Sequence, residues 1–355
     1  TADSNSAVAG VFRQSRFAGP NIEISKQNIA TGSAKAVAII SKNANVATGA
    51  TGRSNAEEIT ELVAATVNAE PSEIILGSTG VIGVQYPMDR IRDYLSQLKS
   101  PFSGREAEAA AAAIMTTDTH PKVASASVGP ATIVGVAKGV GMIEPNMATM
   151  IAVITTDAEI NSDRLDEIFR RIVDKTFNAL SVDTDTSTSD MAIVLASGQA
   201  GAVAEDQFES ALAAVCLSLT RQLAADGEGA ETLIVVDVTS ARDEEQARRV
   251  AKAIVNSPLV KTAIHGRDPN WGRVAMAIGK CGDADINQQD VAIYFGDHEV
   301  YPTPVSPQKL TELETYLGSD EVRITADLGV GNGTFTAYGC DLTDGYVRIN
   351  ADYTT

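Results

Sequence analysis

Apolar residues recur at helical spacing in two segments of the chain. In Ser54–Asn68 the apolar residues fall on one face, and Glu57 follows Ser54 by three residues, as in a capping box. The second segment starts at Asn161-Ser162-Asp163, a typical helix start. The apolar positions of the two predicted helices are Ile59, Leu62, Val63 and Val67, and Leu165, Ile168, Phe169, Ile172, Val173 and Phe177.

Short apolar runs predict β-strands elsewhere. They are Lys35–Ser41, Ile74–Gly77, Met150–Thr156, Met191–Ala196 and Leu233–Val238. These runs are apolar on both faces, which suits a sheet buried between layers better than a sheet with one face in water. The pattern therefore predicts a layered α/β (α+β) fold with helices on the outside.

The character of the sequence changes near residue 241, where an Arg- and Glu-rich predicted helix begins. We predict a catalytic domain over 1–240 and a smaller α/β domain over 241–330, with a linker-like, Pro-rich segment at Tyr301–Pro307. The tail, 331–355, is expected to return to the first domain and its active site.

Composition narrows the function. The chain has 355 residues, enough for two or three domains, and 28 basic against 46 acidic residues give it a charge of −18. This charge disfavours binding to nucleic acid or to an anionic membrane, and no apolar run approaches the ~20 residues of a membrane span. The three cysteines are far apart, which argues against disulfides and for a reducing, cytoplasmic location. We see no secretory leader, although a chain that starts at Thr1 without methionine leaves a trimmed leader open.

One segment carries distinctive chemistry. Residues 138–150 form a Gly-rich, Pro-containing stretch, and Thr149 opens the β-like run that follows it. A threonine at a new N-terminus holds nucleophile and base together, because its own α-amine, with a pKa of about 7.7 to 8.0, can take the hydroxyl proton. The alternative is an ordinary strand threonine after a loop.

Six further stretches accompany this segment in order along the chain. They are Ser78-Thr79-Gly80-Val81-Ile82-Gly83, Thr116-Thr117-Asp118-Thr119, Asp183-Thr184-Asp185-Thr186-Ser187-Thr188, Asp226-Gly227-Glu228-Gly229, Asp268-Pro269-Asn270-Trp271-Gly272-Arg273 and Asn350–Thr355. Together with Thr149 they resemble the ornithine acetyltransferase family, the glutamate N-acetyltransferases of arginine biosynthesis, over nearly the whole chain. The resemblance implies an α-β-β-α sandwich similar to that of related aminopeptidases, and self-cleavage between Ala148 and Thr149.

The resemblance also implies roles for single residues. Thr149 is the expected nucleophile and, through its freed amine, the base, while Thr79 and Gly80 resemble the oxyanion hole. Without the resemblance, Ser78-Thr79-Gly80 reads as a turn. Glu228 is the expected counterion for a distal ammonium. The implied substrate-binding residues are Thr116, Lys138, Thr149, Glu228, Asn350 and Thr355. Strand alternation would send Thr116 and Thr117 to opposite sides, so which of them faces the substrate stays open. Lys42 departs from the family, which usually has glycine there.

The implied reaction moves an acetyl group from N2-acetyl-L-ornithine to L-glutamate by a ping-pong mechanism, without metal or organic cofactor. The α and β segments are expected to stay together as a dimer of αβ heterodimers, a heterotetramer. Alternatives are a bifunctional enzyme that also uses acetyl-CoA, an amidase or aminopeptidase of related fold, and a catalytically silent partner. His120, His265 and His298 are scattered and predict neither a catalytic triad nor a metal site.

Overall fold

The computed structural model describes residues 6–12, 17–100, 102, 104, 106–144 and 150–352. The chain divides into two compact units: unit 1 holds residues 1–178, 186–219 and 355, and unit 2 holds residues 179–185 and 220–354. This division falls within helix α6 (Glu205–Ala225), at residue 219, whereas the domain boundaries at 240 and 330 stay predictions.

Unit 1 is built on a large sheet, which among the described residues has six strands in the order β2-β1-β8-β7-β6-β5. Strands β7 and β8 pair in parallel, and the other neighbours are antiparallel. The strands are β1 (Ser6–Phe12), β2 (Ser33–Ala34), β5 (Lys122–Val128), β6 (Ala131–Lys138), β7 (Ile151–Glu159) and β8 (Met191–Ala202).

A second, parallel pair of strands, β3 (Ala36–Ile40) and β4 (Ile74–Ser78), lies over one face of this sheet. Alternate side chains of β4 serve different layers. Ile74 and Leu76 belong to the apolar cluster of helix α2 (Gly49–Val67), whereas Ile75 belongs to the cluster that holds residues of β1, β7 and β8. The remaining helices before β5 are α1 (Pro20–Ile29), α3 (Met88–Gln97), α4 (Ala107–Ile114) and the 3₁₀ turn η1 (Pro71–Glu73).

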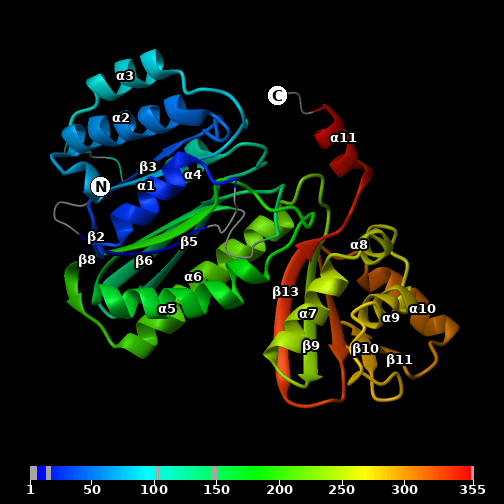
Figure 1. The fold of residues 1–355 in the computed structure, drawn as a ribbon. Coiled ribbons are helices and arrows are strands. Elements are labelled where there is room, and N and C mark those ends of the chain that lie inside the picture. The colour runs from blue at the N-terminus through cyan, green and yellow to red at the C-terminus, as the bar shows by residue number, and fades with distance from the viewer. Residues whose placement is uncertain are drawn as a thin grey trace. The chain divides into compact units, whose positions relative to one another are not determined.

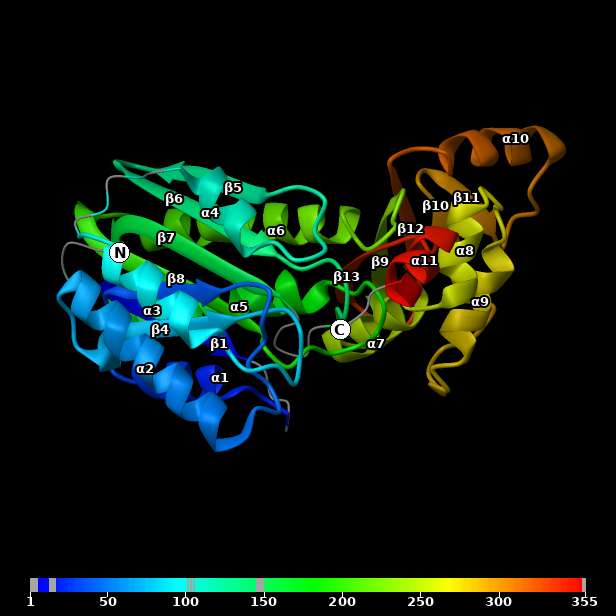
Figure 2. The same cartoon turned by 90° about the horizontal axis from the view of Figure 1, so that it is seen from above.

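Two helices cover the opposite face of the large sheet, α5 (Ser162–Lys175) and α6 (Glu205–Ala225). Helix α5 contacts β1, and a side chain at Gly135 of β6 would meet Val215 and Leu219 of α6 within 3.0 Å. Figure 1 shows α2 and α3 beyond β3 on one side of the large sheet and α5 and α6 on its other side, and Figure 2 shows the same layers from above. The predicted α-β-β-α layering is confirmed.

Unit 2 contains a sheet that, within the described part of the chain, has five strands in the order β11-β10-β12-β9-β13. Strands β9 and β12 are parallel, and β13 returns antiparallel to β9. The strands are β9 (Leu233–Ala241), β10 (Ala292–Phe295), β11 (His298–Tyr301), β12 (Glu321–Asp327) and β13 (Gly333–Cys340). The helices are α7 (Glu244–Val255), α8 (Pro258–His265), α9 (Trp271–Gly279), α10 (Pro307–Tyr316) and α11 (Asp344–Asp352), and the 3₁₀ turn η2 covers Phe177–Ala179.

All five predicted strands are present, and so is α5, whose first turn is capped by the Asn161 side chain. Two details of the helix prediction are wrong. Helix α2 begins at Gly49, five residues before Ser54, because the Asn45 side chain donates to the Gly52 carbonyl at 2.9 Å and so holds an earlier first turn. Phe177 lies in η2, after α5 has ended.

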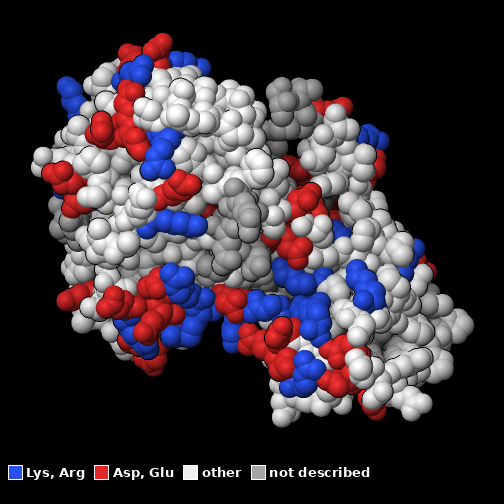
Figure 3. Space-filling model, viewed as in Figure 1, with Lys and Arg blue, Asp and Glu red and all other residues white. Residues whose placement is uncertain are grey.

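Several acidic side chains on the surface of unit 1 form ion pairs with basic side chains. On α5 and α6, Arg171 contacts Glu209 at 2.8 Å and Arg164 contacts Glu205 at 2.5 Å, and Figure 3 shows red and blue side chains intermixed on the face it displays. No helix in the described part of the chain is long and apolar enough to span a membrane.

Candidate active site

The Thr79-Gly80 loop follows directly on β4 and is pressed against the backbone after β3. The Thr79 N–H donates to the Ile40 carbonyl at 3.0 Å. Gly80 has a φ of +131°, and a Cβ there would lie 2.3 Å from the carbonyl carbon of Lys42. Only glycine fits this conformation and this contact.

Lys42 stands where the resemblance predicts a glycine. Its φ is +73°, in the left-handed region where glycine is favoured, so lysine holds a conformation that the family's glycine adopts without strain. Its ammonium donates to the Thr116 carbonyl at 3.5 Å. Lys42 therefore joins the segment beside the Thr79-Gly80 loop to the predicted substrate threonines.

Lys138 ends β6 and is 92 % shielded, with 8 % of its surface exposed, so it is not the surface lysine that its position at a strand end would suggest. Its Nζ donates to the hydroxyl oxygen of Thr79 at 2.9 Å. Because Thr79 accepts this bond, its own O–H proton is directed elsewhere. Lys138 and Thr79, which are far apart in the sequence, thus form a chain of two hydrogen-bond donors.

Asp118 anchors this group, and the sequence interpretation missed it. Its Oδ1 accepts from Lys122 Nζ at 2.9 Å and from the Gly139 N–H at 2.8 Å, and its Oδ2 accepts from the Thr116 N–H at 3.1 Å. Burial raises the pKa of Asp118, but the charges of Lys138 and Lys122 and the Gly139 hydrogen bond outweigh burial and hold the pKa below its ordinary value. The carboxylate is therefore ionised and fixes the end of β6.

Thr116 and Thr117 do not lie on a strand, so the alternation argument for them is wrong. Both are half-buried in the irregular segment between α4 and β5. Thr116 is tied in place through its backbone, by its N–H to Asp118 and by its carbonyl to Lys42.

The predicted nucleophile Thr149 and its neighbour Ala148 lie outside the described residues, as does Thr355. The described chain resumes at Met150, which is buried and accepts at its carbonyl from the Met191 N–H at 3.0 Å. The next residue, Ile151, is the register partner of Lys138. The roles of Thr149, Ala148 and Thr355 stay predictions.

A second group of predicted residues lies in unit 2. Glu228, half-buried in the turn after α6, accepts at Oε2 from the Asn350 side chain at 2.8 Å. Nearby, the hydroxyl of Tyr346 contacts Asp183 at 3.4 Å. Burial, followed by the negative charges of Asp183 and Glu228, raises the pKa of Tyr346 to about 12. This acidic surrounding suits a cationic ligand group.

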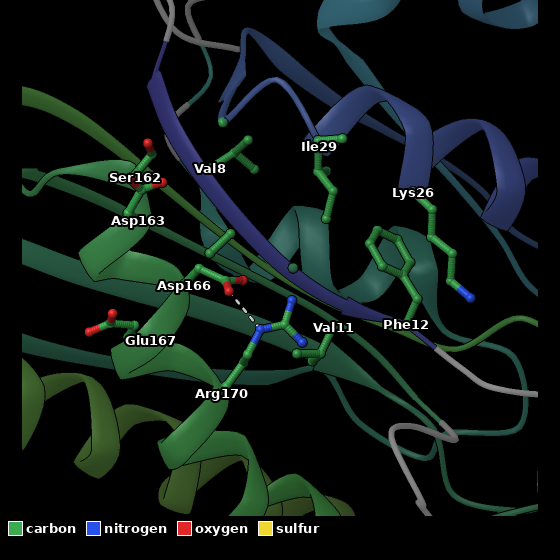
Figure 4. Close-up of a pocket in the computed structure, with 14 residues that line it drawn as sticks. Val8, Val11, Phe12, Lys26, Ile29, Ser162, Asp163, Asp166, Glu167 and Arg170 are labelled. Atoms are coloured by element: carbon green, nitrogen blue, oxygen red, sulfur yellow. Dashed lines mark hydrogen bonds and ion pairs between the residues drawn. The ribbon is translucent and has the colours of Figure 1, made fainter.

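The predicted site residues thus form two groups, one in each unit: Thr79, Gly80, Thr116 and Lys138 in unit 1, and Glu228 and Asn350 in unit 2. None of them lines the cavity of about 710 Å³ in Figure 4, which is formed by described residues of β1, α1 and α5. That cavity has an apolar wall of β1 and an ion pair between Arg170 and Asp166 at 2.6 Å.

Comparison with known proteins identifies the family. The ArgJ family model matches residues 1–355. Glutamate N-acetyltransferase Oat2 of Streptomyces clavuligerus is 52 % identical over 354 residues, covering 98 % of this chain and 90 % of that protein. The arginine biosynthesis bifunctional protein ArgJ of Rhodococcoides fascians is 54 % identical over 348 residues, covering 97 % and 86 %. The crystal structure of the bifunctional ArgJ protein from Bacillus halodurans matches with a TM-score of 0.53 and 44 % identity, covering 56 % of this chain and 97 % of that one.

Proposed function

Because the chain belongs to the ArgJ family, we propose that it transfers an acetyl group from N2-acetyl-L-ornithine to L-glutamate. The observation that carries the proposal is the 2.9 Å hydrogen bond from Lys138 to the Thr79 hydroxyl, at the point where β6 ends. It holds a hydroxyl donor in a fixed, buried place, as acyl transfer requires.

The reaction proceeds in two balanced steps. The Thr149 amine takes the hydroxyl proton, Oγ attacks the acetyl carbonyl, and the C–N bond of the donor breaks as its nitrogen receives that proton. Ornithine leaves and an acetyl ester stays on Thr149. The glutamate amine then attacks the ester carbonyl, the bond from that carbon to Oγ breaks, and Oγ receives, through the Thr149 amine, the proton that the glutamate amine loses. Negative charge develops on the carbonyl oxygen in both steps, where Thr79 and the Gly80 N–H stabilise it.

Glu228 and its acidic surroundings in unit 2 select the substrate. Glu228 supplies a carboxylate for the distal ammonium of ornithine, and Asn350 fixes that carboxylate by donating to Oε2. Thr116 and Lys138 serve as substrate contacts in unit 1, and Thr355 at the chain end completes the substrate-binding set.

Maturation precedes this chemistry. The Thr149 hydroxyl attacks the Ala148 carbonyl, and the peptide C–N bond breaks to give an ester and the free Thr149 amine. Water then hydrolyses the ester, which leaves a carboxylate on Ala148 and restores the Thr149 hydroxyl. The α and β segments stay together as a dimer of heterodimers in the cytoplasm. The relative from Rhodococcoides fascians is named bifunctional. Acetyl-CoA is therefore a second candidate donor for this chain.

Mass spectrometry of the denatured protein tests the proposal. We expect two fragments, 1–148 and 149–355, and one uncut, inactive chain for Thr149→Ala. Incubation with N-acetylornithine should add one acetyl group to the 149–355 fragment, and glutamate should remove it. Full activity in Thr149→Ala, or fragments of other sizes, would refute the mechanism.

The same preparation separates the alternatives. Labelling by acetyl-CoA identifies a bifunctional enzyme. Release of acetate in water alone, at the rate seen with glutamate, identifies a hydrolase instead.

A further inference from the structure

Three potential metal ligands converge in unit 2 from segments that are distant in the sequence. Glu231 precedes β9, His265 ends α8, and Asp341 follows β13. One ligand atom of each lies within 4.8 Å of the others. His265 Nδ1 is 3.3 Å from Asp341 Oδ2 and 3.6 Å from Glu231 Oε2.

Asp341 is the organising member of this cluster. Its side chain is fully buried, and its Oδ1 accepts from the N–H groups of Glu231 at 2.9 Å and Thr232 at 3.0 Å. Its Oδ2 is also buried and, among the described residues, accepts no hydrogen bond, although His265 Nδ1 is close. A buried carboxylate oxygen without a hydrogen bond costs free energy, and a bound cation would remove that cost.

The spacing fits a tetrahedral ion. Zinc binds histidine nitrogen and carboxylate oxygen at about 2.0–2.2 Å, so neighbouring ligands around it lie about 3.3–3.6 Å apart. The two separations from His265 Nδ1, 3.3 and 3.6 Å, fall in this range, and the ligand oxygens of Glu231 and Asp341 lie within 4.8 Å of each other. In such a site the histidine ring nitrogen points at the metal and not at the neighbouring carboxylate oxygen. This agrees with the contact between His265 Nδ1 and Asp341 Oδ2, which is close but makes no hydrogen bond.

We propose that Glu231, His265 and Asp341 bind one divalent transition-metal ion of the zinc type. Two carboxylates balance its charge, the imidazole selects it over magnesium and calcium, and water takes the fourth position. The two backbone N–H groups on Asp341 Oδ1 orient the ligand carboxylate, as outer-shell hydrogen bonds do at metal sites. Glu231 and His265 are partly exposed, with 70 % and 36 % of their side chains accessible, so the ion has a route in.

The ion would act as a brace and takes no part in the acyl transfer described above. It would join the loop that carries Glu228, the end of α8, and the segment that leads from β13 into α11. We therefore expect bound zinc to raise the thermal stability of the protein.

Isothermal titration of the full, chelator-treated chain with Zn²⁺ tests the proposal. Cys281 is a half-exposed free thiol, so the measurement uses a Cys281→Ser background. We expect one ion per chain. His265→Gln and Glu231→Gln should each weaken binding at least ten-fold, because each removes a direct ligand, whereas His298→Gln on β11 should leave it unchanged.

Asp341→Asn would also weaken the two backbone hydrogen bonds to Oδ1 and so disturb folding. The test therefore rests on the variants of the two partly exposed ligands, His265→Gln and Glu231→Gln. If wild type binds Zn²⁺ no more tightly than His265→Gln, His265 and Asp341 form an ion pair only and the proposal fails. Equal weakening by His298→Gln would also refute the assignment of the ligands.

Discussion

Replacing Asp118 by asparagine keeps the shape of the side chain and removes its charge. The Lys122 ammonium, whose side chain is fully buried, would then lose its ion pair at 2.9 Å. Removing one partner of a buried pair costs about 3–5 kcal/mol, because the remaining charge stays desolvated. The bonds from Gly139 and Thr116 would also weaken, since a neutral amide oxygen is a poorer acceptor than a carboxylate.

Differential scanning calorimetry provides the assay. For folding units of about 150–250 residues, each 1 kcal/mol shifts the melting temperature by about 2–4 °C, so Asp118→Asn should lower it by roughly 6–20 °C. Arg170→Gln is the control, because it breaks an ion pair of similar length, 2.6 Å, between exposed side chains. Such exposed pairs contribute about 0–1 kcal/mol. A shift for Asp118→Asn as small as the control's would refute the reasoning.

The pH dependence provides a second check. The pKa of Asp118 is lowered in the folded protein, so its contribution to stability is present above the unfolded pKa of about 3.9 and is lost as pH falls through the folded value. The stability difference between wild type and Asp118→Asn should therefore be constant near neutral pH and shrink below about pH 4. A difference that grows on acidification would contradict the assignment.

Three further predictions concern the site. Thr79→Ala should lower kcat about 10²–10³-fold with little change in KM, measured by steady-state acetyl transfer, because the lost hydroxyl acts on charge present only in the transition state. Gly80→Ala should lower the melting temperature more than Gly83→Ala, since both glycines have positive φ but only Gly80 has backbone, that of Lys42, 2.3 Å from the added carbon. Glu228→Gln should cost N-acetylornithine about 1.5–3 kcal/mol in kcat/KM and spare the uncharged donor N-acetylnorvaline, and equal losses for both donors would leave Glu228 a structural role only.

The layered fold could be predicted because its signals are local. Runs apolar on both faces gave all five predicted strands, and Asn161 marked the start of α5. The start of α2 could not be located in this way. Ser54 and Glu57 match a capping box, but the helix starts about one turn and a half earlier, where the side chain of Asn45, seven residues before Gly52, donates to the Gly52 carbonyl. Ser54 and Glu57 therefore lie inside the helix and do not mark its start.

The site was only partly predictable for a related reason. Thr79, Gly80 and Lys138 were predicted as site residues through family resemblance, which points to expected substrate contacts, and their roles stay predictions. Asp118 was read only as part of a threonine motif, since a carboxylate is normally exposed and nothing local indicates burial. Its burial depends on Gly139, 21 positions away, and on the Lys138 charge beside it. Resemblance to a family points to expected substrate contacts more readily than to residues such as Asp118, which hold those contacts in place.

The Glu231, His265 and Asp341 cluster shows the same limit more sharply. Each residue reads alone as a surface polar group, and the histidines are scattered along the sequence. The register of β13 on β9 brings Glu231 and Asp341 together. The two strands are antiparallel, and Cys340 lies opposite Leu233. Asp341 therefore donates its N–H to the Thr232 carbonyl and accepts at its side chain from the Glu231 N–H. A shift of this register by one residue would turn the Asp341 side chain to the other face of the sheet, away from Glu231 and His265. The cluster is therefore a property of β-sheet pairing, which no motif in the sequence encodes.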